Sequence, residues 1–265
     1  MAAKGSADLI ADLAAAVPVE VIGNLLAVPR AERGPLRAWS LAILGALEPV
    51  LGEGQRERGE QAVAEFLAYL VRLVADRRAH PGDPARDVPT RLIMGETHGD
   101  RLAEPELLHN VIFILNAGHE TTTNLIGNGL FALMEWPEER ARLLAHPERI
   151  RPAVEELLRF ESSNQFGNRV TTRATAVGDR HRRGQSRPRR VPRSGPTGYH
   201  PRANRHLAFG SGAHICAGLN IAGLEGRVAV GRFLARFPAY RLNGTPVHGG
   251  RARFRGFLSI PVALA

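Results

Sequence analysis

Apart from Cys216, the chain contains no cysteine. A single thiol excludes an intramolecular disulfide, and without a second cysteine or a close pair of histidines the usual tetrahedral zinc sites lack their ligands. Long hydrophobic runs are also missing. No uncharged apolar run reaches the roughly 18 residues of a membrane helix, and residues 1–13 lack the apolar core of a signal peptide. We therefore expect a cytoplasmic protein with no membrane partner.

Acidic residues are outnumbered, 26 against 35 lysines and arginines, so the formal net charge is +9. An evenly spread charge of this size would suggest binding to nucleic acid or to an anionic membrane. Here the excess is local, because residues 179–205 contain nine arginines, one aspartate and no lysine. The remainder of the chain is close to neutral, and we expect no nucleic-acid partner.

Apolar residues recur at helical spacing along most of the chain. Proline and polar residues mark residues 80–92 as a loop, and only residues 240–264 have the composition of strands and turns. The sequence therefore predicts a mainly α protein. Helices are expected at residues 6–26 with Ser6 as N-cap and a break at Pro18, and at residues 35–51, 59–75, 104–135, 138–145, 152–160 and 219–237.

Small and polar residues interrupt the apolar pattern in the middle of the helix expected at 104–135, from Asn116 to Thr123. Hydroxyl groups there can bond a backbone carbonyl one turn earlier, and small side chains open a groove along the helix. Gly118 costs a helix interior roughly 1 kcal/mol relative to alanine, which indicates a close approach by a ligand or another backbone. The alternative is an ordinary helix face whose threonines and glutamate contact water.

A second feature is a possible ion pair on the helix expected at 152–160. Glu156 and Arg159 are three residues apart and therefore lie on one helical face. Such pairs are common on solvated helices, where they contribute a few tenths of a kcal/mol. Taken alone, this pair says little about function.

The third feature is the loop that holds the only cysteine, Phe209–Gly218, with the sequence FGSGAHICAG. Its glycines permit tight turns around the thiol, and a helix is expected to begin after Gly218. The N–H groups and the positive dipole end of a helix N-terminus stabilise a thiolate, which suits a sulfur that binds iron, and Phe209 can shield it from water. Two alternatives remain open, an inert buried cysteine and the nucleophile of a cysteine hydrolase, for which the sequence identifies no base.

In order and spacing, these three features resemble those of the cytochrome P450 family of haem-thiolate monooxygenases, in particular its soluble bacterial members. The resemblance extends over residues 1–178 and 202–265. Its specific part is the cysteine loop, and residues 117–121 and 156–159 support it at the expected positions. It implies one partial P450 domain over residues 1–265, the C-terminal portion of that mainly α fold, with a small β-containing tail.

The resemblance also implies roles for individual residues. Cys216 would bind the iron of haem b, and Glu120 and Thr121 would be the acid–alcohol pair that relays protons on the distal side. Glu156 and Arg159 would form a structural pair behind the cysteine loop. Further candidates for binding the haem are Gly118, Phe209 and Gly210, with His214 and Arg169 as partners of the propionates. An apolar small molecule would be the substrate, and a ferredoxin or similar protein would supply electrons, since no flavin or nicotinamide motif occurs.

Two features depart from the family. The chain starts at what resembles a point well inside the family's fold, so we expect an N-terminal truncation that removes part of the pocket. The basic segment 179–201 stands where the family carries a Phe-Pro-Asp-Pro-Asp-Arg type of sequence.

The genetic code offers an explanation for the basic segment. Residues 191–196, VPRSGP, can be encoded as GTT CCC CGA TCC GGA CCG. Without its first base, the same DNA encodes Phe-Pro-Asp-Pro-Asp-Arg. We infer that the reading frame slips near Gly178 and returns near Arg202, so that residues 179–201 form an exposed segment without regular structure. The alternative is a natural, disordered basic insertion such as a nucleic-acid-binding tail.

Two hypotheses about function follow. The first is a haem-thiolate monooxygenase that inserts one oxygen atom of O2 into an apolar small molecule. The second is a catalytically inactive remnant of such an enzyme, translated from a damaged gene.

Overall fold

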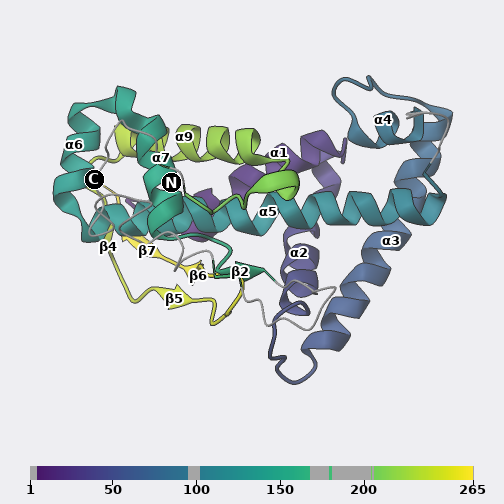
Figure 1. Ribbon diagram of the computed structural model, residues 1–265, viewed down its shortest axis with the longest axis horizontal. Coiled ribbons are helices and arrows are strands. Elements are labelled where there is room, and N and C mark those ends of the chain that lie inside the picture. Colours follow the sequence, from purple (N-terminus) through teal and green to yellow (C-terminus); the bar gives the residue numbers. More distant parts are fainter. Residues whose placement is uncertain (1–4, 95–101, 168–178, 181–203, 205, 265) are drawn as a thin grey trace. The chain divides into compact units, whose positions relative to one another are not determined.

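The computed structural model describes residues 5–94, 102–167, 179–180, 204 and 206–264. It divides into a helical unit, residues 17–120, and a mixed unit, residues 1–16 and 121–265. Helix α5, Glu104–Glu135, contributes its first half to the helical unit and its second half to the mixed unit. Figure 1 shows helices as the main elements of both units. In the described part of the chain, no helix is long and apolar enough to cross a membrane.

The helical unit is built around helix α3. Its elements are α1 (Ala16–Leu25), a 3-10 turn (Arg30–Glu32), α2 (Leu36–Gly45), α3 (Gln55–Ala79), α4 (Val88–Met94) and the first half of α5. Phe66 and Leu70 of α3 are fully buried, and the Trp39 ring of α2 stacks on Phe66 with 5.0 Å between ring centroids. The apolar stripe of α3 therefore supplies the centre of this core.

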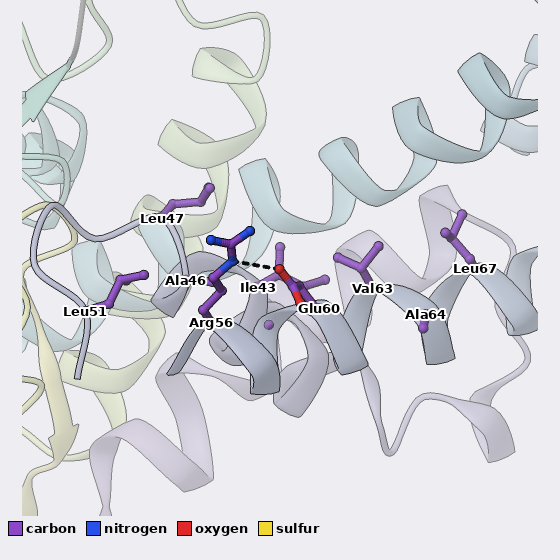
Figure 2. A pocket seen from close by; sticks show the side chains of 10 residues that line it. Ile43, Ala46, Leu47, Leu51, Arg56, Glu60, Val63, Ala64 and Leu67 are labelled. Carbon is purple, nitrogen blue, oxygen red and sulfur yellow. Dashed lines mark hydrogen bonds and ion pairs between the residues drawn. The ribbon is translucent and has the colours of Figure 1, made fainter. Parts of the chain in front are cut away.

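A groove of about 610 Å³ lies on the surface of the helical unit, between α2, the segment after it and the first half of α3. Figure 2 shows its apolar wall, which includes Ile43, Leu47 and Leu51. At its edge Arg56 donates to Glu60 across 2.8 Å.

The helices of the mixed unit are the second half of α5, α6 (Pro137–Ala145), a 3-10 turn (Pro147–Arg149), α7 (Ile150–Phe160) and α9 (Leu219–Arg236). Helix α9 packs closely against its neighbours at Gly226. A Cβ there would lie 3.0 Å from Cδ2 of Leu125 on α5 and 3.1 Å from Cγ1 of Val154 on α7. Gly226 thus serves close packing, although glycine lowers helix propensity.

Short antiparallel strands complete the mixed unit. β1 (Ser6–Asp8), β7 (Pro261–Ala263) and β4 (Arg241–Leu242) form a sheet in the order β1-β7-β4, with Ser6 and Arg241 both opposite Ala263. β5 (Val247–His248) pairs with β6 (Phe257–Ser259), and β2 (Phe166–Gly167) pairs with β3 (Asp179–Arg180). The strand composition predicted for the C-terminal tail is confirmed.

The helix predicted at residues 6–26 is wrong at its start. Ser6 is in strand β1 and is no N-cap, and the carboxylate of Asp8 accepts the N–H groups of Ile10 at 2.8 Å and Ala11 at 3.1 Å. A π-helix, Ile10–Ala14, follows, and Pro18 lies within the first turn of α1, where its missing N–H has no partner to lose. The strand forms because its partner is β7, at the other end of the chain.

The loop predicted at residues 80–92 is also partly wrong, because α4 begins at Val88. Asp87 caps this helix: its carboxylate accepts the N–H of Thr90 at 3.0 Å and the hydroxyl of Thr90 at 2.9 Å. Pro89 occupies the first turn, where proline is tolerated. The other predicted helices are present with shifted ends, and α5 has both of its predicted ends.

Candidate functional site

The cysteine loop of the mixed unit is shaped by two glycines in left-handed conformations. Gly210 has φ +70° and Gly212 has φ +77°, values that a residue with a side chain rarely adopts. The backbone N–H of Gly210 donates to the carbonyl of Leu207, and the N–H of Cys216 donates back to the carbonyl of Phe209, both at 2.9 Å. These turns hold Cys216 on a closed loop, with its side chain exposed.

Helix α9 begins directly after this loop, as the sequence predicted. Gly218 is its N-cap residue, and the N–H of Leu219 donates to the carbonyl of Cys216 at 3.3 Å. The thiol therefore lies within one turn of a helix N-terminus, whose N–H groups and dipole favour a negative charge. This is an environment in which a thiolate is stabilised.

Two further candidates of the loop differ in their surroundings. Phe209 is half-buried and packs with Ala208 against an apolar cluster that includes Leu157 and Leu158 of α7. Its ring also lies 5.7 Å from the ring of His206, between centroids. His214 closes the 3-10 turn Gly212–His214 and is exposed.

Glu156 and Arg159 form a buried ion pair on α7. Oε1 of Glu156 accepts from Nη2 of Arg159 at 2.7 Å, and Oε2 accepts from Nε at 2.8 Å. Their side chains are 7% and 2% exposed, so this pair is not one of the solvated pairs that the spacing usually signifies. Because both charges are out of water, each depends on the other.

Sequence reasoning missed a third member of this network, Asn204. Its Nδ2 donates to Oε2 of Glu156 at 2.8 Å, across 48 residues of sequence. Asn204 lies just ahead of the cysteine loop, and no local pattern in the sequence marks it as a partner of Glu156.

His206 was missed as well. Its Nε2 lies 2.8 Å from Oε2 of Glu155, and its side chain is only 5% exposed. The hydrogen bond from His206 holds the pKa of Glu155 below its ordinary value, although partial burial of Glu155 acts in the opposite direction. The only sequence signal for His206 was its position three residues before Phe209, next to the cysteine loop.

In the helical unit, the close approach predicted at Gly118 has a packing explanation. A Cβ on Gly118 would lie 2.8 Å from Cδ1 of Ile22 on α1. The side chain of Ile22 therefore accounts for the glycine without a ligand. Asn116 donates from Nδ2 to the carbonyl of Ile112 at 2.8 Å, the bond to the preceding turn expected of polar residues in this helix.

Glu120 and Thr121 follow each other on α5. Glu120 is 5% exposed. The pKa of the neighbouring His119 is lowered to about 4, mainly by burial and also by the nearby charge of Arg37. The imidazole of His119 is therefore neutral at neutral pH. In the mixed unit, Thr121 is half-buried and its carbonyl accepts the hydroxyl of Ser163 at 2.7 Å. The polar stretch is thus largely enclosed and does not form a solvated face.

Some predictions fall outside the described residues. Arg169, a candidate partner of a propionate, is one of them, as are residues 181–203 of the basic segment. The first two residues of that segment, Asp179 and Arg180, form strand β3 opposite β2.

Similarity to known proteins identifies the family. A sequence model of cytochrome P450 matches residues 40–181, just over half of the chain. The chain is 34% identical to polyketide biosynthesis cytochrome P450 PksS of Bacillus subtilis, over 100% of this chain and 67% of that protein. The chain belongs to the cytochrome P450 family. Cytochrome P450 107B1 of Saccharopolyspora erythraea is also 34% identical, over 99% of this chain and 66% of its own length.

Solved P450 structures share the fold. P450BioI, in complex with an acyl carrier protein ligated with hexadec-9Z-enoic acid, matches with a TM-score of 0.89 and 27% identity over 99% of this chain. The structure of PksS matches with a TM-score of 0.88 and 31% identity over 100% of this chain. This chain covers 70% of each of those two chains. The predicted P450 fold is confirmed, and the chain spans about two thirds of the length of the curated relatives.

P450 proteins carry haem, and the cysteine loop fits that group. Cys216, the only thiol of the chain, is exposed on its loop and lies ahead of a helix N-terminus. Gly210 and Gly212 place no side chains beside it, and a Cβ added at Gly218 would contact only the sulfur of Cys216, at 3.8 Å. A cysteine sulfur is a soft donor of the kind that binds haem iron.

Proposed function

We propose that the protein is a haem-thiolate monooxygenase in which Cys216 binds the iron. The observation that supports this most directly is the exposed thiol on a glycine-shaped loop directly before α9, in a chain of the P450 family. The bound haem would supply the activation of O2 and the transfer of one oxygen atom. Two electrons and two protons are consumed, one oxygen atom enters a C–H bond of the substrate, and the other leaves as water.

In this proposal the protein's own groups hold charge and move protons. Cys216 lies on the loop directly before the N-terminus of α9 and would hold the iron through its sulfur. The carboxyl group of Glu120 and the hydroxyl group of Thr121 form an acid–alcohol pair that delivers the two protons. His214 and Arg169 pair with the propionates, and Phe209 and Gly210 shape the loop.

The substrate we propose is an apolar small molecule, and the electron donor is a ferredoxin or a similar redox protein. The relatives support the substrate class only broadly: PksS is named for polyketide biosynthesis, and P450BioI was solved with a fatty-acyl carrier protein.

Isotope labelling tests the reaction. The haem-loaded chain, supplied with a ferredoxin, its reductase, NADPH and a panel of apolar compounds under 18O2, is expected to yield a product with one labelled oxygen atom. Thr121→Ala and Glu120→Gln are each expected to lower the rate about 100-fold or more, because proton delivery by a positioned group typically contributes roughly 10²- to 10⁴-fold. Unlabelled products, or equal rates in both variants, would contradict the proposal.

A second candidate is an inactive remnant of such an enzyme. It is favoured by the coincidence that the match to the family model ends at residue 181, where the arginine-rich stretch begins. The out-of-frame reading of residues 191–196 supports the same interpretation. Sequencing the gene across codons 170–210 tests it, and restoring the family frame between Gly178 and Arg202 is expected to raise haem content. A confirmed reading frame together with turnover by the unaltered chain would refute it.

A further inference from the structure

The segment just ahead of the cysteine loop is attached to α7 by two side chains. Asn204 donates to Oε2 of Glu156 at 2.8 Å, and His206 contacts Oε2 of Glu155 at 2.8 Å. The two acceptors are neighbours in sequence, so both attachments reach the same turn of one helix. All of these residues belong to the mixed unit.

The hydrogen bonds of His206 define its tautomer. The backbone N–H of Ala208 donates to Nδ1 of His206 at 3.2 Å, so Nδ1 carries no proton. Nε2 therefore carries a proton and donates a hydrogen bond to Oε2 of Glu155. A single imidazole thus joins α7 on one side to the backbone of the approaching loop on the other.

The attachment extends to the thiol through a short series of contacts. Two residues after His206, Ala208 and then Phe209 pack against the apolar cluster of α7. The carbonyl of Phe209 accepts the N–H of Cys216 at 2.9 Å. Fixing His206 therefore fixes Phe209, and Phe209 fixes the backbone of Cys216.

Asn204 is held for a related reason. Its Nδ2 donates to the carboxylate of Glu156, and its Oδ1 is buried with no hydrogen-bond partner among the described residues. A turned amide would place its oxygen against the carboxylate of Glu156. The charge of Glu156 therefore sets the orientation of Asn204.

We propose that His206 and Asn204 are positioning residues that hold the cysteine loop on α7, so that Cys216 stays before the N-terminus of α9 as a thiolate ligand. The proposal rests on the haem-thiolate function proposed above. His206 is the main member, because it contacts both α7 and the loop backbone.

Three substitutions of His206 separate its two bonds. His206→Gln keeps an N–H for Glu155, His206→Asn keeps an acceptor for Ala208, and His206→Phe keeps only the ring shape. In the haem-loaded chain, His206→Phe is expected to lower the ratio of thiolate-ligated to non-thiolate haem about fivefold in the reduced carbon monoxide spectrum, the equilibrium factor of one hydrogen bond. His206→Gln and His206→Asn are expected to recover part of that loss.

The matched control is His80, whose Nδ1 lies 3.3 Å from Oδ1 of Asp76 on α3. This is also a histidine–carboxylate pair, but its side chains are 81% and 53% exposed. His80→Phe is expected to leave the spectral ratio unchanged. If His206→Phe also leaves it unchanged while the parent chain shows thiolate ligation, the positioning role is refuted.

A second readout needs no haem. Cys216 is the only cysteine, so the rate of alkylation by iodoacetamide at pH 7 reports on this thiol alone. In the haem-free chain, His206→Phe is expected to change the rate of alkylation, because the released loop no longer holds the sulfur at its position before α9. In urea the two rates should coincide. An equal rate in the folded proteins refutes the positioning role, whereas a missing haem spectrum with an altered alkylation rate refutes only the haem proposal.

Should His206→Phe fail to fold by circular dichroism, Glu155→Ala provides the same test. Glu155 is 37% exposed, so its removal leaves the core intact. The expected effects have the same direction and about half the size on a logarithmic scale, because His206 keeps its bond to Ala208. No change in alkylation by this variant would again count against the proposal.

Discussion

Two Glu–Arg pairs, each spanning about one helical turn, have similar donor–acceptor distances in very different surroundings. On α3, Arg56 donates to Glu60 across 2.8 Å, and their side chains are 74% and 65% exposed (Figure 2). On α7, Arg159 donates to Glu156 across 2.7 Å, and their side chains are 2% and 7% exposed. Spacing in the sequence makes both pairs possible, but only the fold decides which one is removed from water.

The difference determines what each pair contributes. Water solvates Arg56 and Glu60 whether or not they meet, so their pairing is nearly neutral. Glu156 and Arg159 are removed from water and hydrogen-bond each other, and Glu156 also accepts a hydrogen bond from Asn204. Loss of one partner there leaves a buried charge without compensation.

The largest effect is expected from Arg159→Ala. This variant should lose about 3–5 kcal/mol of unfolding free energy, because Glu156 would remain buried without its counter-ion. Urea denaturation followed by circular dichroism measures the change. A loss below about 1 kcal/mol would mean that the α7 pair behaves like a surface pair, and the contrast with α3 would disappear.

A smaller loss is expected from Asn204→Ala. It should cost about 1–3 kcal/mol, since one hydrogen bond to a charged group is removed while Arg159 stays in place. Asn204→Asp is expected to be worse than Asn204→Ala, because it brings a second carboxylate beside Glu156. Equal stability of the two variants in the same denaturation experiment would show that Asn204 does not contact Glu156 in solution.

A third carboxyl group, that of Glu225, is buried and extends this comparison. Glu225 of α9 is 7% exposed, and its Oε2 has no hydrogen-bond partner in the part of the chain that the structure describes. Burial raises the pKa of Glu225 to about 7. The folded chain therefore keeps a proton that the unfolded chain releases near pH 4–5.

The resulting pH dependence has a definite sign. Between the ordinary glutamate pKa of about 4.3 and a pKa of about 7, the unfolded state binds fewer protons, so the unfolding free energy falls as pH rises. Glu225→Gln removes this slope. The variant should match the parent chain at pH 4 and exceed it by about 1–3 kcal/mol at pH 8. If the variant loses as much unfolding free energy between pH 4 and pH 8 as the parent chain does, this assignment is contradicted.

The smallest effect is expected on the surface of α3. Arg56→Ala should leave the melting temperature unchanged within measurement error, because the pair it breaks is solvated. A clear drop in the melting temperature of this variant would show that the exposure of an ion pair does not indicate its contribution to stability in this protein.

Much of the fold could be predicted because its signals are local. Both ends of α5 were predicted, since a long apolar pattern without an interior proline favours one uninterrupted helix. Ser6 was misassigned because its strand partner is Ala263, far away in sequence. The start of α4 at Val88 was missed because proline was taken as a loop signal, whereas here it occupies a first turn.

The candidate site divides in the same way. The loop around Cys216 has a recognisable local pattern of glycines before a helix, and the structure has the loop and the helix as predicted. Asn204 and His206 act on residues about 50 positions away, so no pattern in their own segment could identify them. At Gly118 the sequence correctly predicted a close approach to the helix, but it could not identify the neighbour, which is Ile22.

The central claim, that Cys216 provides a thiolate to haem iron, is tested most directly by one spectrum. The chain is loaded with haem, reduced with dithionite and exposed to carbon monoxide, beside Cys216→Ala treated in the same way. The account predicts the red-shifted Soret band of thiolate-ligated haem in the parent chain and its complete absence in the variant. The same spectrum in both proteins, or no haem binding by the parent chain, would contradict it.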